Sequence, residues 1–209
     1  ISKVQGSGNV SPMAGSTVAV TGVVTARIKT GFFIQTPDDK IDGDAATSEG
    51  IFVFTGSREQ PPADALPGTL VTGTGKVEEF RPNNQTSGLT VTEIVFRRDL
   101  DKLTVVTKNV QLPKPVEITG AEMKPNRLDQ LERFEGMRVR IAQMTVIAPT
   151  GGRVDIKNDS SETNGTFFGV VAGIARPFRE EGFEIESLLE MDKAALNALK
   201  AAFPKMAVF

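Results

Sequence analysis

The feature that most constrains the fold is a series of short strand-like runs with no long helical pattern between them. Five such runs occur in the first half of the chain, at residues 17–26, 31–36, 51–54, 70–80 and 89–96. They are separated by clusters of Gly, Pro, Asp and Asn, which favour turns. A parallel doubly wound sheet needs crossover helices between its strands, so this pattern favours a small, partly open β-barrel.

The first run, TVAVTGVVTA, contains a change of phase in its apolar alternation. Val18 and Val20 alternate with polar or small residues before Gly22, and Val24 and Ala26 continue the apolar row after it. A glycine at a phase shift is typical of a bent or bulged strand. The run therefore predicts one long strand with a bend, which is how a small barrel closes.

Two proline-containing stretches interrupt the strand pattern. Residues 57–67, SREQPPADALP, contain two adjacent prolines and predict a loop or a single turn. Residues 97–118 are charged and then interrupted by Pro113 and Pro115, which bias the residues before them toward extended conformations. This second stretch predicts a connector, with a domain boundary between about residues 108 and 122.

The second half of the chain repeats the pattern of the first. The string EGMRVRIAQMTVIA at 135–148 has the alternation and phase shift of AGSTVAVTGVVTA, and NGTFFGVV at 164–171 parallels TGFFIQT. Internal duplication of one structural unit explains these parallels better than chance does. We therefore expect a mainly all-β chain with two small five-stranded β-barrels, over residues 1–110 and 111–209.

Short helices are predicted only in the second half. The spacing of Asn126 and Asp129 resembles a helix capping box, and Gly136 supplies a C-terminal stop. Near the end of the chain, DKAALNALKAAF begins with Asp192 as an N-cap and places apolar residues on one face before Pro204. The second barrel is therefore expected to carry a C-terminal amphipathic helix.

Two missing residue types exclude several classes of enzyme. The chain has no His and no Cys, which excludes Ser-His-Asp and Cys-His triads, thiolate metal sites and disulfides. No run approaches the ~18 apolar residues of a membrane-spanning helix. The formal net charge of −2 at pH 7 disfavours strong non-specific DNA binding, because such binding depends on cations that neutralise phosphates.

Several strings occur in the order found in a known family. They are IxxVQGSGxxSPMAGSTVxVTGVVTA, GFFIQ, DGDAATSEGIFVF and PGTLVTGTGKVEEF. Together they resemble the OB-fold-like (oligonucleotide/oligosaccharide-binding) region that precedes the catalytic domain in secreted bacterial nucleases of the endonuclease/exonuclease/phosphatase superfamily. ERFEGMRVRI in the second half is also similar to these proteins. The resemblance spans residues 1–94 and implies OB-like barrels, an extracellular or periplasmic location, and attachment to a metal-dependent phosphodiesterase domain.

The nuclease activity implied for the family does not extend to this chain. The family's catalytic domain uses a His base, which a chain without His lacks. No catalytic residues are apparent, so we expect a non-catalytic module that binds or positions a ligand, with nucleic acid as the partner that the resemblance implies. The alternative is a structural spacer or a cell-surface protein-interaction module, which the acidic net charge and the lack of Trp and Tyr favour.

Five carboxylates gather in the loop between the second and third strand-like runs. Hard oxygen ligands at this density suit Ca²⁺, which is the one cofactor that the sequence suggests. The spacing does not follow the EF-hand pattern, and a solvated acidic turn is the alternative. The candidate metal ligands are Asp38, Asp39, Asp42, Asp44 and Glu49.

Aromatic and basic residues of the first half are candidates for contacts with nucleic acid. Phe is the only ring available for stacking on bases, and Phe52 and Phe54 lie on the strand-like run that follows Phe32 and Phe33. A Phe doublet in a strand places one ring toward the core and the other toward solvent. Core packing is the alternative for most of these rings, and a mixed, solvated surface is the alternative for the basic residues. The candidate contacts are Phe32, Phe33, Arg58, Lys76 and Arg81, with Arg97, Arg98 and Lys102 on the same predicted basic edge.

Overall fold

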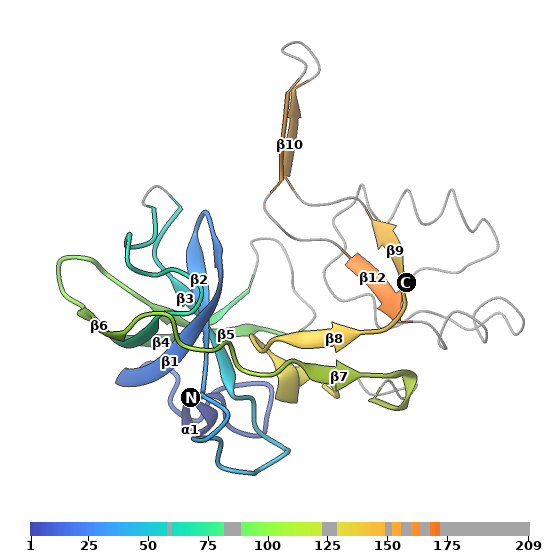
Figure 1. Cartoon of the computed structure of the whole chain (residues 1–209), viewed down its shortest axis with the longest axis horizontal. Coiled ribbons are helices and arrows are strands. Elements are labelled where there is room, and N and C mark those ends of the chain that lie inside the picture. Colours follow the sequence, from blue (N-terminus) through green and yellow to red (C-terminus); the bar gives the residue numbers. More distant parts are fainter. Residues whose placement is uncertain are drawn as a thin grey trace, which may run out of the picture. The chain divides into compact units, whose positions relative to one another are not determined.

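The structure is a computed structural model of the 209-residue chain (Figure 1). It describes residues 1–57, 60–81, 89–122, 129–148, 152–155, 160–163 and 168–171. The chain divides into two compact units. Unit 1 comprises Ile1–Gln85, Leu89–Glu117 and Asp129–Arg140, and unit 2 comprises the rest. Unit 1 thus includes a segment, Asp129–Arg140, that the sequence pattern assigns to the second half.

Unit 1 is built on a closed five-stranded barrel. Its strands are β1 (Thr17–Ile28), β2 (Gly31–Gln35), β3 (Gly50–Phe54), β4 (Leu70–Phe80) and β5 (Val91–Val95). Their order is β1-β2-β3-β5-β4, and β1 also pairs with β4, which closes the barrel (Figure 1). All of these pairs are antiparallel except β3 with β5. The mainly β fold and the five-stranded barrel predicted for the first half are confirmed.

The barrel interior is filled by apolar side chains that alternate along the strands. The residues between them point to the outer face, as the two-residue period of a strand requires. Most core residues are β-branched, and such side chains pack well on a pleated surface. The core of the barrel strands comprises Val18, Val20, Val24, Phe32, Ile34, Ile51, Val53, Val71, Val77 and Ile94.

The long strand β1 bends so that it can pair with two neighbours. It pairs with β4 through residues 17–23 and with β2 through residues 23–28. The register shifts between Val24 and Ala26, so the predicted irregularity is present but lies beyond Gly22. Ala26 is exposed rather than part of the core row, because the bulge turns the residues after it to the opposite face.

Two short strands lie within the stretch that the sequence analysis treats as a connector. β6 (Leu103–Thr107) pairs with β4, and β7 (Val116–Ile118) pairs with β8 (Val139–Ile141). Leu103 and Val105 pack against the barrel core. Residues 97–118 are therefore only partly a connector, because the half-apolar run Leu103–Thr107 forms strand hydrogen bonds with β4.

Helical structure is sparse in the described residues. α1 (Ser2–Gln5) is a single turn, and η1 (Gly120–Glu122) and η2 (Glu132–Phe134) are 3-10 turns. Residues 60–67 form turns without a helix, as predicted. Of the helix predicted before Gly136, the described residues form only the turn η2. The backbone leaves the helical conformation at Glu135. No helix of the described residues has the length and apolar character needed to cross a bilayer.

The described strands of unit 2 form two separate pairs. β9 (Met144–Ala148) pairs with β12 (Phe168–Val171), and β10 (Gly152–Asp155) pairs with β11 (Ser160–Thr163), both antiparallel. A second five-stranded barrel is thus not seen in the described part of this unit. The predicted C-terminal amphipathic helix lies outside the described residues.

Candidate ligand-binding face

Three phenylalanine rings, which we call the Phe cluster, lie together on the outer face of β2 and β3. Phe33 is the direct cross-strand neighbour of Phe52, and their ring centroids are 4.8 Å apart. The centroid of Phe52 lies 6.5 Å from that of Phe54. The three side chains are half-buried, whereas their strand neighbours Phe32 and Val53 belong to the core. These separations are typical of interacting aromatic rings, so the cluster is one continuous platform.

A glycine makes room for the central ring of the Phe cluster. A Cβ atom at Gly31 would lie 2.5 Å from Cζ of Phe52 and 2.2 Å from the carbonyl oxygen of Val53. The ring of Phe52 therefore lies against the backbone of β2, where any side chain at position 31 would displace it. This packing fixes the ring before any ligand arrives, and such preorganisation lowers the cost of binding.

Apolar residues of the neighbouring strands extend this outer face. Ala26 of β1 pairs with Phe33, and Ile28 pairs with the first residue of β2. Val95 of β5 is the parallel partner of Phe54. Ala26 is exposed, and Ile28 and Val95 are half-buried. A contiguous accessible apolar surface on a folded domain marks an interaction site more often than isolated apolar residues do.

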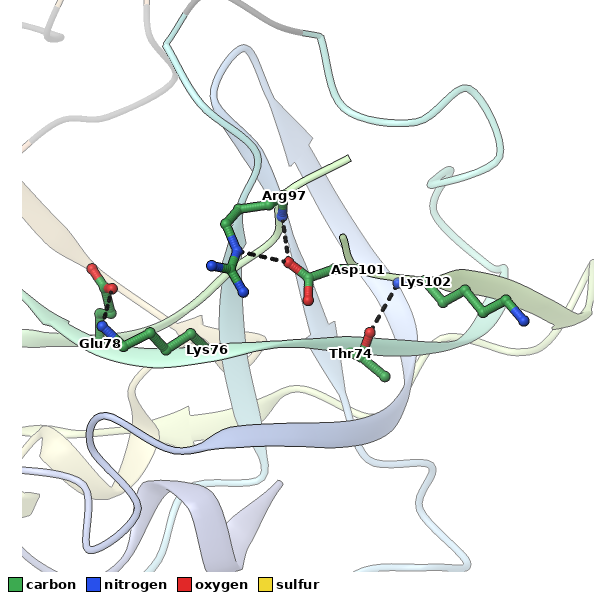
Figure 2. A network of polar contacts seen from close by, with 6 residues as sticks. All are labelled: Thr74, Lys76, Glu78, Arg97, Asp101 and Lys102. Atoms are coloured by element: carbon green, nitrogen blue, oxygen red, sulfur yellow. Dashed lines mark hydrogen bonds and ion pairs between the residues drawn. The ribbon is translucent and has the colours of Figure 1, made fainter. Parts of the chain in front are cut away.

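Two glutamates border the Phe cluster on β5 and β4. Glu93 is the parallel partner of Phe52 and the antiparallel partner of Glu78, so it shares the outer face with both. Burial, with a smaller contribution from the charge of Glu78, raises the pKa of Glu93 to about 7. The Nζ of Lys76 donates a hydrogen bond to Glu78 at 2.9 Å (Figure 2). The charge beside the cluster therefore changes near neutral pH.

Both arginine side chains of the β5–β6 connection have hydrogen-bond acceptors. The backbone N and Nε of Arg97 donate to Oδ2 of Asp101 at 2.7 and 3.3 Å (Figure 2). Arg98 donates to the carbonyl oxygen of Gln60 at 2.9 Å. The backbone of Lys102 is held by Thr74, as Figure 2 also shows. These contacts make a mixed surface on this side of the barrel.

The structure separates the predicted nucleic-acid contacts. Phe32 has no exposed surface and belongs to the barrel core, while Phe33 is part of the Phe cluster. Lys76 is paired with a neighbouring glutamate, and Arg81 is exposed. Arg58 lies outside the described residues. Glu93 was not predicted as a border residue, although the alternation with Thr92 and Ile94 in a strand places it on the opposite, outer face.

Carboxylates of the acidic loop bind backbone N–H groups within the loop. Oδ1 of Asp42 accepts from the backbone N of Asp44 at 2.8 Å, and Oδ1 of Asp44 accepts from that of Ala46 at 2.9 Å. Oε1 of Glu49 accepts from the backbone N of Asp42 at 3.0 Å. The hydrogen bond from Asp44 is the main reason why the pKa of Asp42 is lowered. These carboxylates therefore order the turn themselves.

The other two acidic residues of the loop have separate partners. Oδ1 of Asp38 accepts from the backbone N of Lys114 at 3.0 Å, and Asp39 lies 3.4 Å from Nζ of Lys40. In the part of the chain that the structure describes, no three acidic side chains form a group that could hold a metal ion. The Ca²⁺ site therefore stays a prediction from the sequence, without support from this geometry.

No protein-family model matches the chain, and no curated protein matches it. A functional assignment must therefore rest on the geometry of the described residues. Within unit 1, the Phe cluster is the feature best suited to hold a ligand, because its rings are accessible and adjacent and the central ring packs against Gly31.

Proposed function

We propose that unit 1 is a non-catalytic binding module that holds single-stranded nucleic acid by stacking its bases on the Phe cluster. The observation that carries this proposal is the group of three adjacent, half-buried rings on the outer face of β2 and β3. Stacking of a base on such a ring is worth about 1–3 kcal/mol and tolerates any base sequence. The strand order and the parallel β3–β5 pair fit an OB-like barrel, whose face at the second and third strands carries oligomeric ligands.

The proposed role is to position a strand for another domain. The ordered strings of the first half are similar to the regions that precede the catalytic domain in secreted nucleases, and in such a protein the module would hold the substrate near the metal-dependent phosphodiesterase domain. The chain itself supplies no His for that chemistry. An extracellular or periplasmic location is part of the same proposal.

The Phe cluster is expected to dominate the affinity for single strands. Phe33→Ala and Phe52→Ala should each weaken binding of a short oligothymidylate by about 5-fold to 100-fold, because each removes a stacking surface. The measurement is fluorescence anisotropy at low salt with a labelled oligonucleotide. Phe80→Ala is the matched control, since Phe80 is 48% exposed at the end of β4 and lies outside the cluster. Absence of saturable binding by the wild-type protein at high micromolar concentration would refute the proposal.

Ionisation of Glu93 is expected to weaken the same binding. The carboxyl is mostly neutral below its pKa of about 7 and charged above it, so affinity for a polyanion should fall by about 3-fold to 10-fold between about pH 6 and pH 8. Glu93→Gln should keep the low-pH affinity across this range. Glu117→Gln, at an exposed position on β7, should retain the wild-type profile. A flat wild-type profile would show that the strand does not pass Glu93.

A second candidate function is a protein-interaction module. It is favoured by the apolar extension of the Phe cluster through Ala26, Ile28 and Val95. The pairing of Lys76 with Glu78 and of Arg97 with Asp101 also leaves this side of the barrel with mixed charge. The two functions differ in salt dependence, because phosphate contacts weaken steeply with ionic strength whereas apolar docking does not.

A further inference from the structure

The segment Asp129–Arg140, which we call the docked segment, belongs to unit 1 although it lies beyond the barrel strands in sequence. Its contacts reach several barrel strands. The backbone N of Arg138 donates to Oε1 of Gln35 at the end of β2, at 2.8 Å. The backbone N of Thr92 in β5 donates to Oε1 of Glu135 at 2.8 Å. One side-chain carboxyl of the docked segment thus accepts a hydrogen bond from the main chain of the barrel.

The docked segment also touches β3 backbone to backbone. A Cβ atom at Gly50 would lie 2.3 Å from the carbonyl carbon of Gly136, so the two glycines permit an approach that other residues would block. Gly136 has a φ of 68°, a conformation that favours glycine. Beside it, the Oγ of Ser48 donates to the carbonyl oxygen of Glu135 at 2.6 Å. The position of Glu135 is therefore set by contacts on either side of it.

Two carboxyl groups of the docked segment are held at this contact. Oε1 of Glu132 and Oε2 of Glu135 are buried, and neither accepts from an N–H or hydroxyl donor among the described residues. The two carboxyls are close enough to share a proton in a hydrogen bond with each other. The other charged groups that act on the pair are also acids, Glu79 of β4 and Asp129. Two negative charges in this setting would repel each other and would lack solvation, so the arrangement favours retention of a proton.

We propose that the docked segment is a pH-dependent latch, held on the barrel while the Glu132–Glu135 pair retains a proton and released when both carboxyls are ionised. The proton passes to solvent, and the two charges left behind destabilise the docked state. Residues 129–140 lie between the barrel strands and β9 in sequence, so release frees this part of the connection from the barrel. This inference does not depend on ligand binding by the Phe cluster.

The direction of the pH dependence is set by the carboxyl pKa values. Burial, and next the neighbouring Glu132, raise the pKa of Glu135 to about 9, and burial raises the pKa of Glu132. A carboxyl whose pKa is higher in the docked state binds its proton more tightly there. Docking is therefore fully favoured below the ordinary pKa of 4.5 and is progressively lost as the pH rises toward 9.

Hydrogen exchange measured by mass spectrometry on the full chain tests the latch. Protection factors, corrected for intrinsic exchange, should fall about tenfold or more in peptides covering the docked segment between about pH 6 and pH 9, while β1 peptides stay protected. Glu135→Gln should remove this dependence, because its amide oxygen can accept from Thr92 while its NH₂ donates to Glu132. Glu117→Gln, exposed on β7, should behave as wild type. Protection that does not change with pH in the wild-type protein, or that changes equally in Glu135→Gln, would overturn the proposal.

A second measurement keeps the test independent of the folding of the variant. Carboxyl-carbon NMR of the wild-type protein follows the titration of Glu135 directly. A midpoint more than about two pH units above the ordinary value is expected for the latch. A midpoint near 4.5, the ordinary value for a glutamate, would mean that the carboxyl is already ionised at neutral pH while docked, and the latch would be rejected.

Discussion

Phe32→Ala is expected to lower the free energy of unfolding by about 3–5 kcal/mol, whereas Phe33→Ala should cost about 1 kcal/mol or less. Phe32 has no exposed surface and fills the barrel interior, so its removal leaves a cavity that rigid strands cannot close. The ring of Phe33 lies on the outer face and is half-buried. Urea denaturation of the two variants measures the difference.

The comparison of adjacent residues also tests the register of β2. A shift of one residue would exchange the inner and outer faces of the whole strand. Equal destabilisation by Phe32→Ala and Phe33→Ala, or a larger cost for Phe33→Ala, would show that the assigned inner face is wrong. The Phe cluster would then not be a surface, and the proposed stacking of bases would have no structural basis.

Gly50→Ala is expected to lower the free energy of unfolding by about 2–3 kcal/mol or to displace the docked segment. The new Cβ atom would lie 2.3 Å from the carbonyl carbon of Gly136 and 2.4 Å from the backbone N of Met137. Both are backbone atoms, which cannot turn aside as the end of a flexible side chain can. Urea denaturation measures the total loss of unfolding free energy, and hydrogen exchange identifies which segments lose protection.

Gly8→Ala is the matched control for that variant. A Cβ atom at Gly8 would meet nothing within 4 Å, so its effect should stay within about 0.5 kcal/mol of wild type. If Gly50→Ala displaces only the docked segment, protection from hydrogen exchange should fall in residues 129–140 and persist in the barrel strands. Wild-type stability and wild-type protection in Gly50→Ala would contradict the close contact between β3 and the docked segment.

Local pattern accounts for the strands that the sequence predicts well. The limits of β4 match the prediction, and those of β2, β3 and β5 differ from it by one or two residues at their ends. Alternation and flanking turn residues are properties of a few consecutive positions, so they can be read without knowing the fold. β6 was missed because its short half-apolar run becomes a strand only through pairing with β4.

The candidate site was predicted less completely than the fold. The FF doublet indicates that one ring is accessible, but the partners of Phe33 come from β3 and the space for Phe52 comes from Gly31 on β2. These contacts depend on cross-strand register, which the sequence does not specify by itself. Lys76 was predicted as a ligand contact although the two-residue period of a strand already places Glu78 on its face, and the structure shows the ion pair between them.

The amino-acid sequence by itself determined the five barrel strands of the first half and the lack of His and Cys side chains, since both depend on residue identities and short-range periodicity. Only the tertiary structure decided that β1 pairs with β4 to close the barrel and that the docked segment packs on that barrel. It also decided which carboxyls lose their solvent, as the contact between Thr92 and Glu135 illustrates. Burial of a polar group depends on residues far away in the chain, so no local pattern predicts it.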